Sequence, residues 1–212
     1  MISPGIAGAY RENADRPVAY IDETYQIQRA PYFYVTTAVV VQASQRDAVR
    51  SDIQAIVGGT FWHTTEPLRS ETGRLQAKEL LHYLGDPDGR EVAVISHEAH
   101  IDLEADPMGE VGRAAALTAL LAHVHTELGV NLFVLERRSP NRLATLDQRT
   151  KAEAMKANLI APQSRMFQTS PADEPLLWLP DLVCGAYRQS ITGRDGSFFE
   201  EIESICTKIL GT

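Results

Sequence analysis

The stretch Val18-Ala19-Tyr20-Ile21-Asp22-Glu23 has the pattern of a short apolar strand that ends in two acids. β-branched, aromatic and small residues before the acids are typical of a strand that is buried on both faces. A carboxylate at the end of such a strand is held rigidly at the rim of a sheet, where a hard metal ion needs its oxygen ligands. The stretch therefore predicts an acidic site at the end of the first strand, and other acids must converge on Asp22 to complete it.

A second strand is predicted over residues 32–41, where aromatic and β-branched residues follow one another. The polar turn over residues 24–31 separates it from the first strand at residues 17–22, so the two are expected to form an antiparallel hairpin. Further strands are expected over residues 60–63, 91–96, 130–136 and 165–168. Helices are expected over residues 44–57, 75–84, 108–128, 143–159, 179–191 and 197–210. A hairpin followed by alternating strands and helices predicts an α/β fold with a mixed sheet, in which ligands bind at the strand ends.

The remaining organisation is simple. Residues 1–16 are polar and are expected to form an irregular N-terminal arm. No internal repeat and no Ser/Gly linker interrupts the rest, so residues 17–212 are expected to form a single domain.

Composition limits the classes of partner. The net charge of the 212-residue chain is −8, which argues against a general DNA-binding protein but not against an enzyme with a local basic face. The most apolar helical stretch, residues 114–122, is far shorter than the roughly 20 residues that cross a bilayer. The N-terminus lacks the basic-then-apolar pattern of a signal peptide. We therefore expect a cytoplasmic protein with no membrane contact.

Cysteine and histidine patterns give no zinc signature. Cys184 and Cys206 do not form a C-x-x-C pair, and both are expected as reduced thiols within helices. The run His97-Glu98-Ala99-His100 lacks the spacing of a zinc-protease helix and is expected to lie in an exposed loop.

Several short motifs along the chain carry a family resemblance. They are Tyr20-Ile21-Asp22-Glu23, residues 32–41, Trp62-His63-Thr64-Thr65-Glu66, Leu135-Glu136-Arg137-Arg138 and Leu179-Pro180-Asp181-Leu182-Val183-Cys184-Gly185-Ala186. Their order resembles that of the domain of unknown function 3800 family, whose fold is similar to that of RNase H-like nucleases. The family opens with Tyr-Ile-Asp-Glu-Ser-Gly, its middle strand ends in an acid followed by basic residues, and Leu-Gln-x-Ala-Asp precedes its last helix. The resemblance covers about residues 18–190 and implies a single RNase H-like α/β domain, with a mixed central sheet that opens with an antiparallel hairpin.

This chain departs from the family pattern at three places. Thr24-Tyr25 replaces the Ser-Gly that follows the first acids, and Glu136 stands where the family usually has Asp. Residues 177–180 replace Leu-Gln-x-Ala ahead of Asp181. The acids themselves are retained.

The resemblance implies a metal site. RNase H-like enzymes hold divalent ions between acids from adjacent strands and one helix, so Asp22, Glu136 and Asp181 are the expected ligands of Mg²⁺ or Mn²⁺. Magnesium keeps several waters, so two or three protein carboxylates suffice. Glu23 is a further candidate ligand, although a continuing strand points it to the opposite face from Asp22. His63 matches a strand-end histidine of the family and is a candidate catalytic residue together with the three acids.

A basic segment follows the second acid. Arg137, Arg138 and Arg142 are expected to contact substrate, because phosphates must be drawn to an otherwise acidic site. The sequence therefore predicts a divalent-metal-dependent nuclease or phosphodiesterase whose partner is RNA or DNA.

Each of these residues also has a purely structural explanation. Asp22 and Glu23 suit a cap on the turn after the first strand, Glu136 suits an ion pair with a neighbouring arginine, and Asp181 suits the first turn of a helix. His63 suits a structural hydrogen bond beside an aromatic residue. If these explanations hold, the chain is a non-catalytic module that keeps the fold and binds a protein partner or a second copy of itself.

Overall fold

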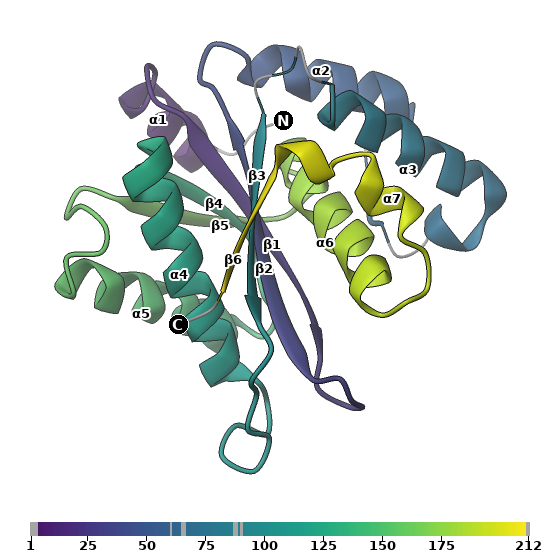
Figure 1. Cartoon of the computed structure of the whole chain (residues 1–212). Coiled ribbons are helices and arrows are strands. Elements are labelled where there is room, and N and C mark those ends of the chain that lie inside the picture. The colour runs from purple at the N-terminus through teal and green to yellow at the C-terminus, as the bar shows by residue number, and fades with distance from the viewer. Residues whose placement is uncertain (1–3, 60, 65–66, 87–88, 90, 211–212) are drawn as a thin grey trace.

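The computed structural model describes residues 4–59, 61–64, 67–86, 89 and 91–210 (Figure 1). In these ranges the strands form a six-stranded sheet with the order β5-β4-β1-β2-β3-β6. The strands are β1 (Val18–Gln26), β2 (Phe33–Val41), β3 (Val92–Glu98), β4 (Leu132–Glu136), β5 (Arg165–Thr169) and β6 (Cys206–Leu210). The first three pair antiparallel, while β4 runs parallel to β1, β5 parallel to β4, and β6 parallel to β3. The predicted α/β fold with a mixed sheet and an opening hairpin is confirmed.

Helices cover both faces of the sheet (Figure 1). One face packs against α4 (Glu110–Leu128), with α5 (Asn141–Lys156) beside it. The other packs against α6 (Trp178–Ile191), with α2 (Arg46–Val57), α3 (Glu71–Leu84) and α7 (Ser197–Glu200) around it. Every residue of β2 is buried, as the long apolar run predicts for a strand between two helical layers.

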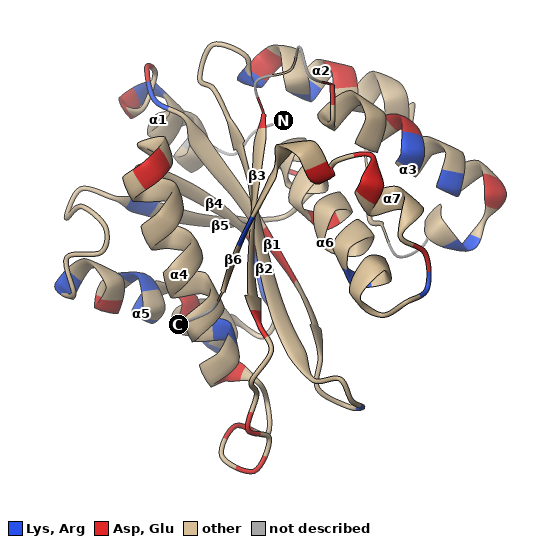
Figure 2. Ribbon diagram, in the orientation of Figure 1, with Lys and Arg blue, Asp and Glu red and all other residues tan. Residues whose placement is uncertain are grey.

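Alternate residues of β1 belong to different cores. Val18 and Tyr20 lie in the core under α6, whereas Ala19 and Ile21 lie in the core under α4. The acids of β1 form a red segment in a sheet that is otherwise mostly tan in Figure 2. By the same alternation, Asp22 faces α6 and Glu23 faces α4.

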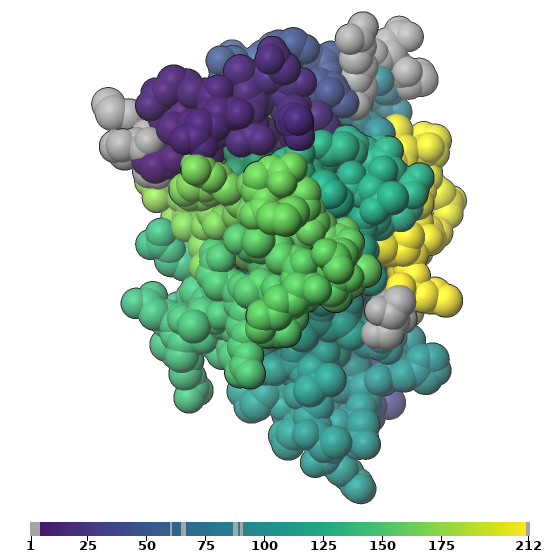
Figure 3. Space-filling view, turned by 90° about the vertical axis from the view of Figure 1, so that its left-hand side faces the viewer, coloured from purple at the N-terminus to yellow at the C-terminus, as the bar shows by residue number. Residues whose placement is uncertain are grey.

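The prediction of an irregular N-terminal arm is wrong for the described residues. Pro4–Glu12 form helix α1, and its residues Ile6, Ala9 and Tyr10 are buried in the core on the α6 side. Their spacing is helical, so the segment buries one apolar stripe despite its polar composition. Figure 3 shows this purple segment lying directly above the green segment that follows α4, and Glu12 pairs there with Arg165.

The prediction of one long C-terminal helix over residues 197–210 is also wrong. The helix α7 ends at Glu200, a 3₁₀ turn spans Glu203–Ile205, and β6 completes the sheet, so Cys206 lies on a strand. Phe198, Phe199 and Ile202 are buried at helical spacing, which explains why the pattern favours a helix. Pairing with the edge of β3 determines the conformation of the residues after them.

Three smaller predictions also differ from the structure. The first strand continues to Gln26, beyond the expected turn at residue 24, because Thr24 and Gln26 are buried in alternation. Residues 61–63 are not a strand, and residue 60 lies outside the described residues. His97 and Glu98 belong to β3 rather than to an exposed loop. None of the helices in the described ranges has the length and apolar character that crossing a membrane requires.

Candidate carboxylate site

Two acids lie side by side on the α6 face of the sheet. In the parallel pair of β1 and β4, Ile21 lies opposite Leu135, so the next residues, Asp22 and Glu136, are neighbours at the end of β4. Both follow residues of the α6-side core at a spacing of two, and they therefore share that face.

Helix α6 supplies the third acid. It begins at Trp178, and Asp181 lies in its first turn rather than at its N-cap. The hydroxyl of Thr37, the β2 residue opposite Asp22, donates to the carbonyl oxygen of Pro180 at 3.0 Å. This contact fixes the start of α6 over β1 and β2. The structure thus brings together the three acids that the sequence motifs single out, from two adjacent strands and one helix.

The three carboxyl groups repel one another. Burial raises the pKa of Asp22 well above its usual range, and the charges of Asp181, Glu23 and Glu136 raise it further. Burial, followed by the charge of Asp181, also raises the pKa of Glu136. Only 8% of Asp22 is exposed, and among the described residues no lysine or arginine forms an ion pair with Asp22 or Glu136. A proton or a bound cation relieves such repulsion.

Hydrogen bonds from a neighbouring loop orient Asp181. The backbone N–H of Thr64 donates to Asp181 Oδ2 at 2.7 Å, and His63 Nδ1 lies 3.7 Å from the same oxygen. Burial raises the pKa of Asp181, while the Thr64 hydrogen bonds and the His63 charge oppose that rise. The His63 side chain is 54% exposed, so it lies at the mouth of the site. The histidine therefore belongs to the site, although it comes from a loop and not from a strand end.

The loop sits very close to α6. The indole N–H of Trp62 donates to Thr64 Oγ1 at 3.1 Å, and a Cβ atom at Gly185 would lie 2.6 Å from Thr64 Cγ2. Cys184, one residue earlier on α6, contacts the Thr37 hydroxyl at 3.2 Å, and burial together with Asp22 raises the pKa of its thiol. The residue types of Thr37, Thr64 and Gly185 do not mark them in the sequence as site residues. Their only signal is position, since all three lie within the resembling motifs and Thr37 is opposite Asp22.

Glu23 does not join the other three acids. It lies on the α4 face, where its Oε2 is 2.6 Å from Arg113 Nη1 and its Oε1 accepts a hydrogen bond from the Tyr34 hydroxyl at 3.4 Å. Arg138 Nε is 3.7 Å from the same carboxylate. The Glu23 side chain therefore acts on the site through its charge alone, as strand alternation predicts, while the Glu23 backbone forms a hydrogen bond with Asp22.

The basic residues after Glu136 do not line the site as a group. Arg138 donates to both carboxylate oxygens of Glu110 and lies in a partly buried network with Asp147 on the α4–α5 side. Arg137 is exposed and donates to the carbonyl oxygen of Gln168 at 2.9 Å. Arg142 is exposed in the first turn of α5. The guanidinium of Arg138 is thus already engaged by carboxylates and is poorly placed for a phosphate.

The donor atoms of the site suit a hard cation. Asp22, Glu136 and Asp181 offer only oxygen, the ligand that Mg²⁺ and Mn²⁺ prefer. Within the described ranges, no group of three or more His, Cys, Asp or Glu side chains is placed so that it could hold a metal ion as it stands. Magnesium is commonly bound by one or two carboxylates, with waters and substrate phosphates completing its shell. The donor set therefore fits an ion that is shared with substrate.

The apparent histidine motif further along the chain has a structural role. His97 packs edge-on against Tyr187, and its Nδ1 lies 3.0 Å from the Tyr187 hydroxyl. Burial lowers the pKa of His97. These contacts join β3 to α6, so His97 has a structural explanation that needs no metal ion.

The chain matches no family model and no curated protein. Its likeness to the domain of unknown function 3800 family stays a prediction, and a fold alone does not determine an activity, so the chemistry of the site must indicate the function.

Proposed function

We propose that this protein is a divalent-metal-dependent phosphodiesterase that acts on nucleic acid at Asp22, Glu136 and Asp181. One observation carries the proposal: these acids converge from β1, β4 and α6, and no arginine or lysine of the described residues pairs with Asp22 or Glu136. The charges of Asp181 and Glu136 raise the pKa of Asp22, and the charge of Asp181 raises the pKa of Glu136. Evolved sites that keep buried charges in mutual repulsion are commonly functional. The resemblance to RNase H-like nucleases supports the same assignment.

The roles of the side chains follow from how each is held. Asp22 and Glu136 extend from paired strands, so their positions are rigid, and the Thr64 amide orients Asp181. From these three residues, one or two carboxylates would ligate Mg²⁺ or Mn²⁺ directly, with waters and a substrate phosphate completing the shell of the ion. When bound, such an ion polarises a phosphoryl oxygen and lowers the pKa of a coordinated water. His63 Nδ1 lies 3.7 Å from Asp181 Oδ2 and its imidazole is exposed at the mouth of the site, so His63 would act as the general acid toward the leaving oxygen.

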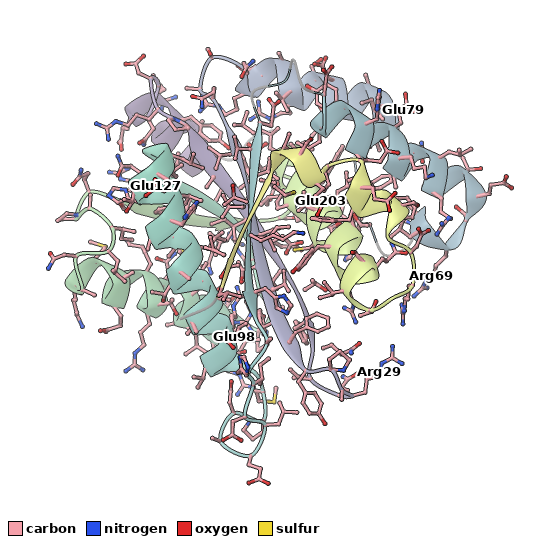
Figure 4. All side chains as sticks on the ribbon, in the orientation of Figure 1. Arg29, Arg69, Glu79, Glu98, Glu127 and Glu203 are labelled. Atoms are coloured by element: carbon pink, nitrogen blue, oxygen red, sulfur yellow. The ribbon has the colours of Figure 1, made fainter. Side chains whose placement is uncertain are left out.

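Metal titration tests the proposed ligands. We expect millimolar Mg²⁺ or Mn²⁺ to raise the melting temperature of the parental protein. At a hundredfold excess of the ion over its Kd, the free energy of unfolding should increase by about 2.7 kcal/mol. D22N and D181N should fold and lose this response. Glu79 is exposed on α3, and Figure 4 shows it across the molecule from Arg29 at the hairpin tip, so E79Q is the matched control that keeps the response.

Hydrolysis of a fluorophore-labelled oligonucleotide is the second measurement. D22N and D181N should lower the rate at least about a hundredfold, because loss of a ligand removes several kcal/mol of transition-state stabilisation. Parental rates in both variants would show that the site is elsewhere. If neither ion stabilises the protein and no hydrolysis occurs, the non-catalytic binding module is the better description.

A further inference from the structure

Arg188 lies on the same face of the sheet as the carboxylates. It is two turns after Asp181 on α6, and residues at that spacing share one side of a helix. Its Nη1 donates to Thr24 Oγ1 at 3.0 Å. Thr24 is two residues after Asp22 on β1 and therefore faces α6 as well. The guanidinium thus sits next to the carboxylate site, displaced by roughly 7 Å along β1 toward the hairpin.

Two other arginines gather around Arg188. Arg29 lies at the tip of the β1–β2 hairpin (Figure 4), and Arg194 lies in the turn after α6. Burial lowers the pKa of Arg188, and the nearby charges of Arg194 and Arg29 lower it further. In the part of the chain that the structure describes, no aspartate or glutamate forms an ion pair with any of the three. A protein of net charge −8 therefore keeps two further cations near Arg188, and an anionic ligand would relieve their repulsion of its guanidinium.

The geometry of Arg188 suits a phosphate. A guanidinium carries five N–H donors in a rigid fork, and in the described structure Thr24 accepts one of them. That hydrogen bond, together with partial burial, fixes the side chain and reduces the entropy lost when it binds. Arginine held in this way binds phosphate through two parallel hydrogen bonds, which lysine cannot do.

We propose that Arg188, assisted by Arg29 and Arg194, binds a phosphate of a nucleic-acid strand adjacent to the phosphate that lies at the carboxylates. This inference deepens the proposed function, on which it rests for the identity of the strand. It assigns substrate binding to the α6 face, in place of the segment after Glu136 that the sequence favours. Because Arg188 is displaced from the carboxylates along β1, the bound nucleic acid is expected to run from the carboxylates toward the hairpin tip.

Binding of a fluorescein-labelled single-stranded oligodeoxynucleotide, without metal and in EDTA, tests the inference. Fluorescence anisotropy over a range of salt concentrations gives both the affinity and its salt dependence. We expect R188Q to weaken binding about tenfold and to lower the slope of log K against log salt by about 0.7, the value for one phosphate contact on a single strand. R188K should restore the slope but only part of the affinity.

Control variants separate a local contact from bulk charge. Arg149 is exposed on α5, on the opposite side of the sheet, so R149Q changes the net charge equally and should leave affinity and slope near parental. The double variant R29Q/R194Q alters two exposed side chains outside the core, and it should weaken binding even if R188Q perturbs the packing of α6. Equal effects of R188Q and R149Q, or no binding by the parental protein at low salt, overturn the inference.

Because binding is measured without metal, its outcome is independent of catalysis. If R188Q weakens binding while the parental protein hydrolyses nothing, the phosphate site stands and the proposed function fails. If D22N abolishes hydrolysis while R188Q binds as the parental protein does, the proposed function stands and the phosphate site fails.

Discussion

The buried carboxyl group of Asp22 has a cost in stability that depends on pH. Its pKa in the folded protein is raised by burial and by Asp181, above the value of about 3.9 expected in the unfolded chain. A raised folded pKa contributes stability below about pH 4, and this contribution is lost as pH rises through the folded pKa. We therefore expect D22N to melt at a higher temperature than the parental protein at pH 7–8, and this advantage to vanish below about pH 4. Thermal denaturation across that range, without metal, is the measurement.

Asp195 provides a control of opposite sign. Hydrogen bonds from Ser197 and Arg74 lower the pKa of Asp195, so its charged form is favoured in the folded protein. D195N should therefore melt lower than the parental protein above about pH 4, and the deficit should disappear in acid. A lower melting temperature for D22N at pH 8 would mean that the three carboxylates do not repel one another.

Single positions differ in how far the sequence predicts them. The placement of Asp22 and the opposite facing of Glu23 follow from strand alternation, which needs only local sequence. The role of Arg138 does not follow from local sequence. Its partners Glu110 and Asp147 lie on α4 and α5, and the sequence does not show that these helices surround Arg138. Arg188 was missed for the same reason: its partner Thr24 is far away in sequence.

At the scale of elements, the contact between α6 and the loop at residues 61–64 controls Asp181. An added Cβ at Gly185 would lie 2.6 Å from Thr64 Cγ2, and Thr64 is a buried β-branched residue that has little room to move. We expect G185A to push the Thr64 amide away from Asp181 and to weaken metal binding about 10- to 100-fold, the usual effect of losing an orienting contact. Calorimetric titration with Mn²⁺ is the measurement.

A second helical glycine gives the matched control. Gly8 lies in α1, and the nearest atom to an added Cβ there is Arg11 Nη2 at 3.9 Å, an ordinary contact. G8A should leave metal affinity unchanged and stabilise the protein by about 0.5–1 kcal/mol, because alanine restricts the unfolded chain more than glycine does. Parental metal affinity in G185A would mean that the loop does not orient the site.

Element types were predictable where apolar periodicity is long and uninterrupted. The run of residues 32–41 and the Ala- and Leu-rich stretch that forms α4 have one dominant pattern each, and both were predicted correctly. The C-terminal segment was predicted incorrectly. Phe198, Phe199 and Ile202 give a helical pattern, but pairing with β3 makes residues 206–210 a strand. Local periodicity carries no information on which strands will pair when they are far apart in sequence.

For the molecule as a whole, one buried acid joins parts of the chain that are distant in sequence. Glu174 is fully buried and accepts hydrogen bonds from the Tyr10 hydroxyl at 2.6 Å and from Arg50 Nε and Nη2, each at 3.0 Å. It also accepts from the backbone N–H of Leu176, in the 3₁₀ turn Pro175–Leu177 that leads directly into α6. Glu174 therefore ties α1 and α2 to the segment that positions Asp181.

Neutralising Glu174 should loosen the N-terminal helix before the rest of the molecule. E174Q keeps the shape of the side chain but leaves the Arg50 guanidinium partly buried beside a neutral amide, and breaking a buried ion pair costs about 3–5 kcal/mol. We expect the melting temperature to fall on the order of 10 °C for a chain of this length, and limited proteolysis to cut first near residues 11–16. The other carboxylate at Arg50, Asp47, has a side chain that is 91% exposed, so D47N should cost no more than about 1 kcal/mol. Equal losses in E174Q and D47N would show that α1 is not anchored through Glu174, and that its apolar residues Ile6, Ala9 and Tyr10 hold it against the core without that carboxylate.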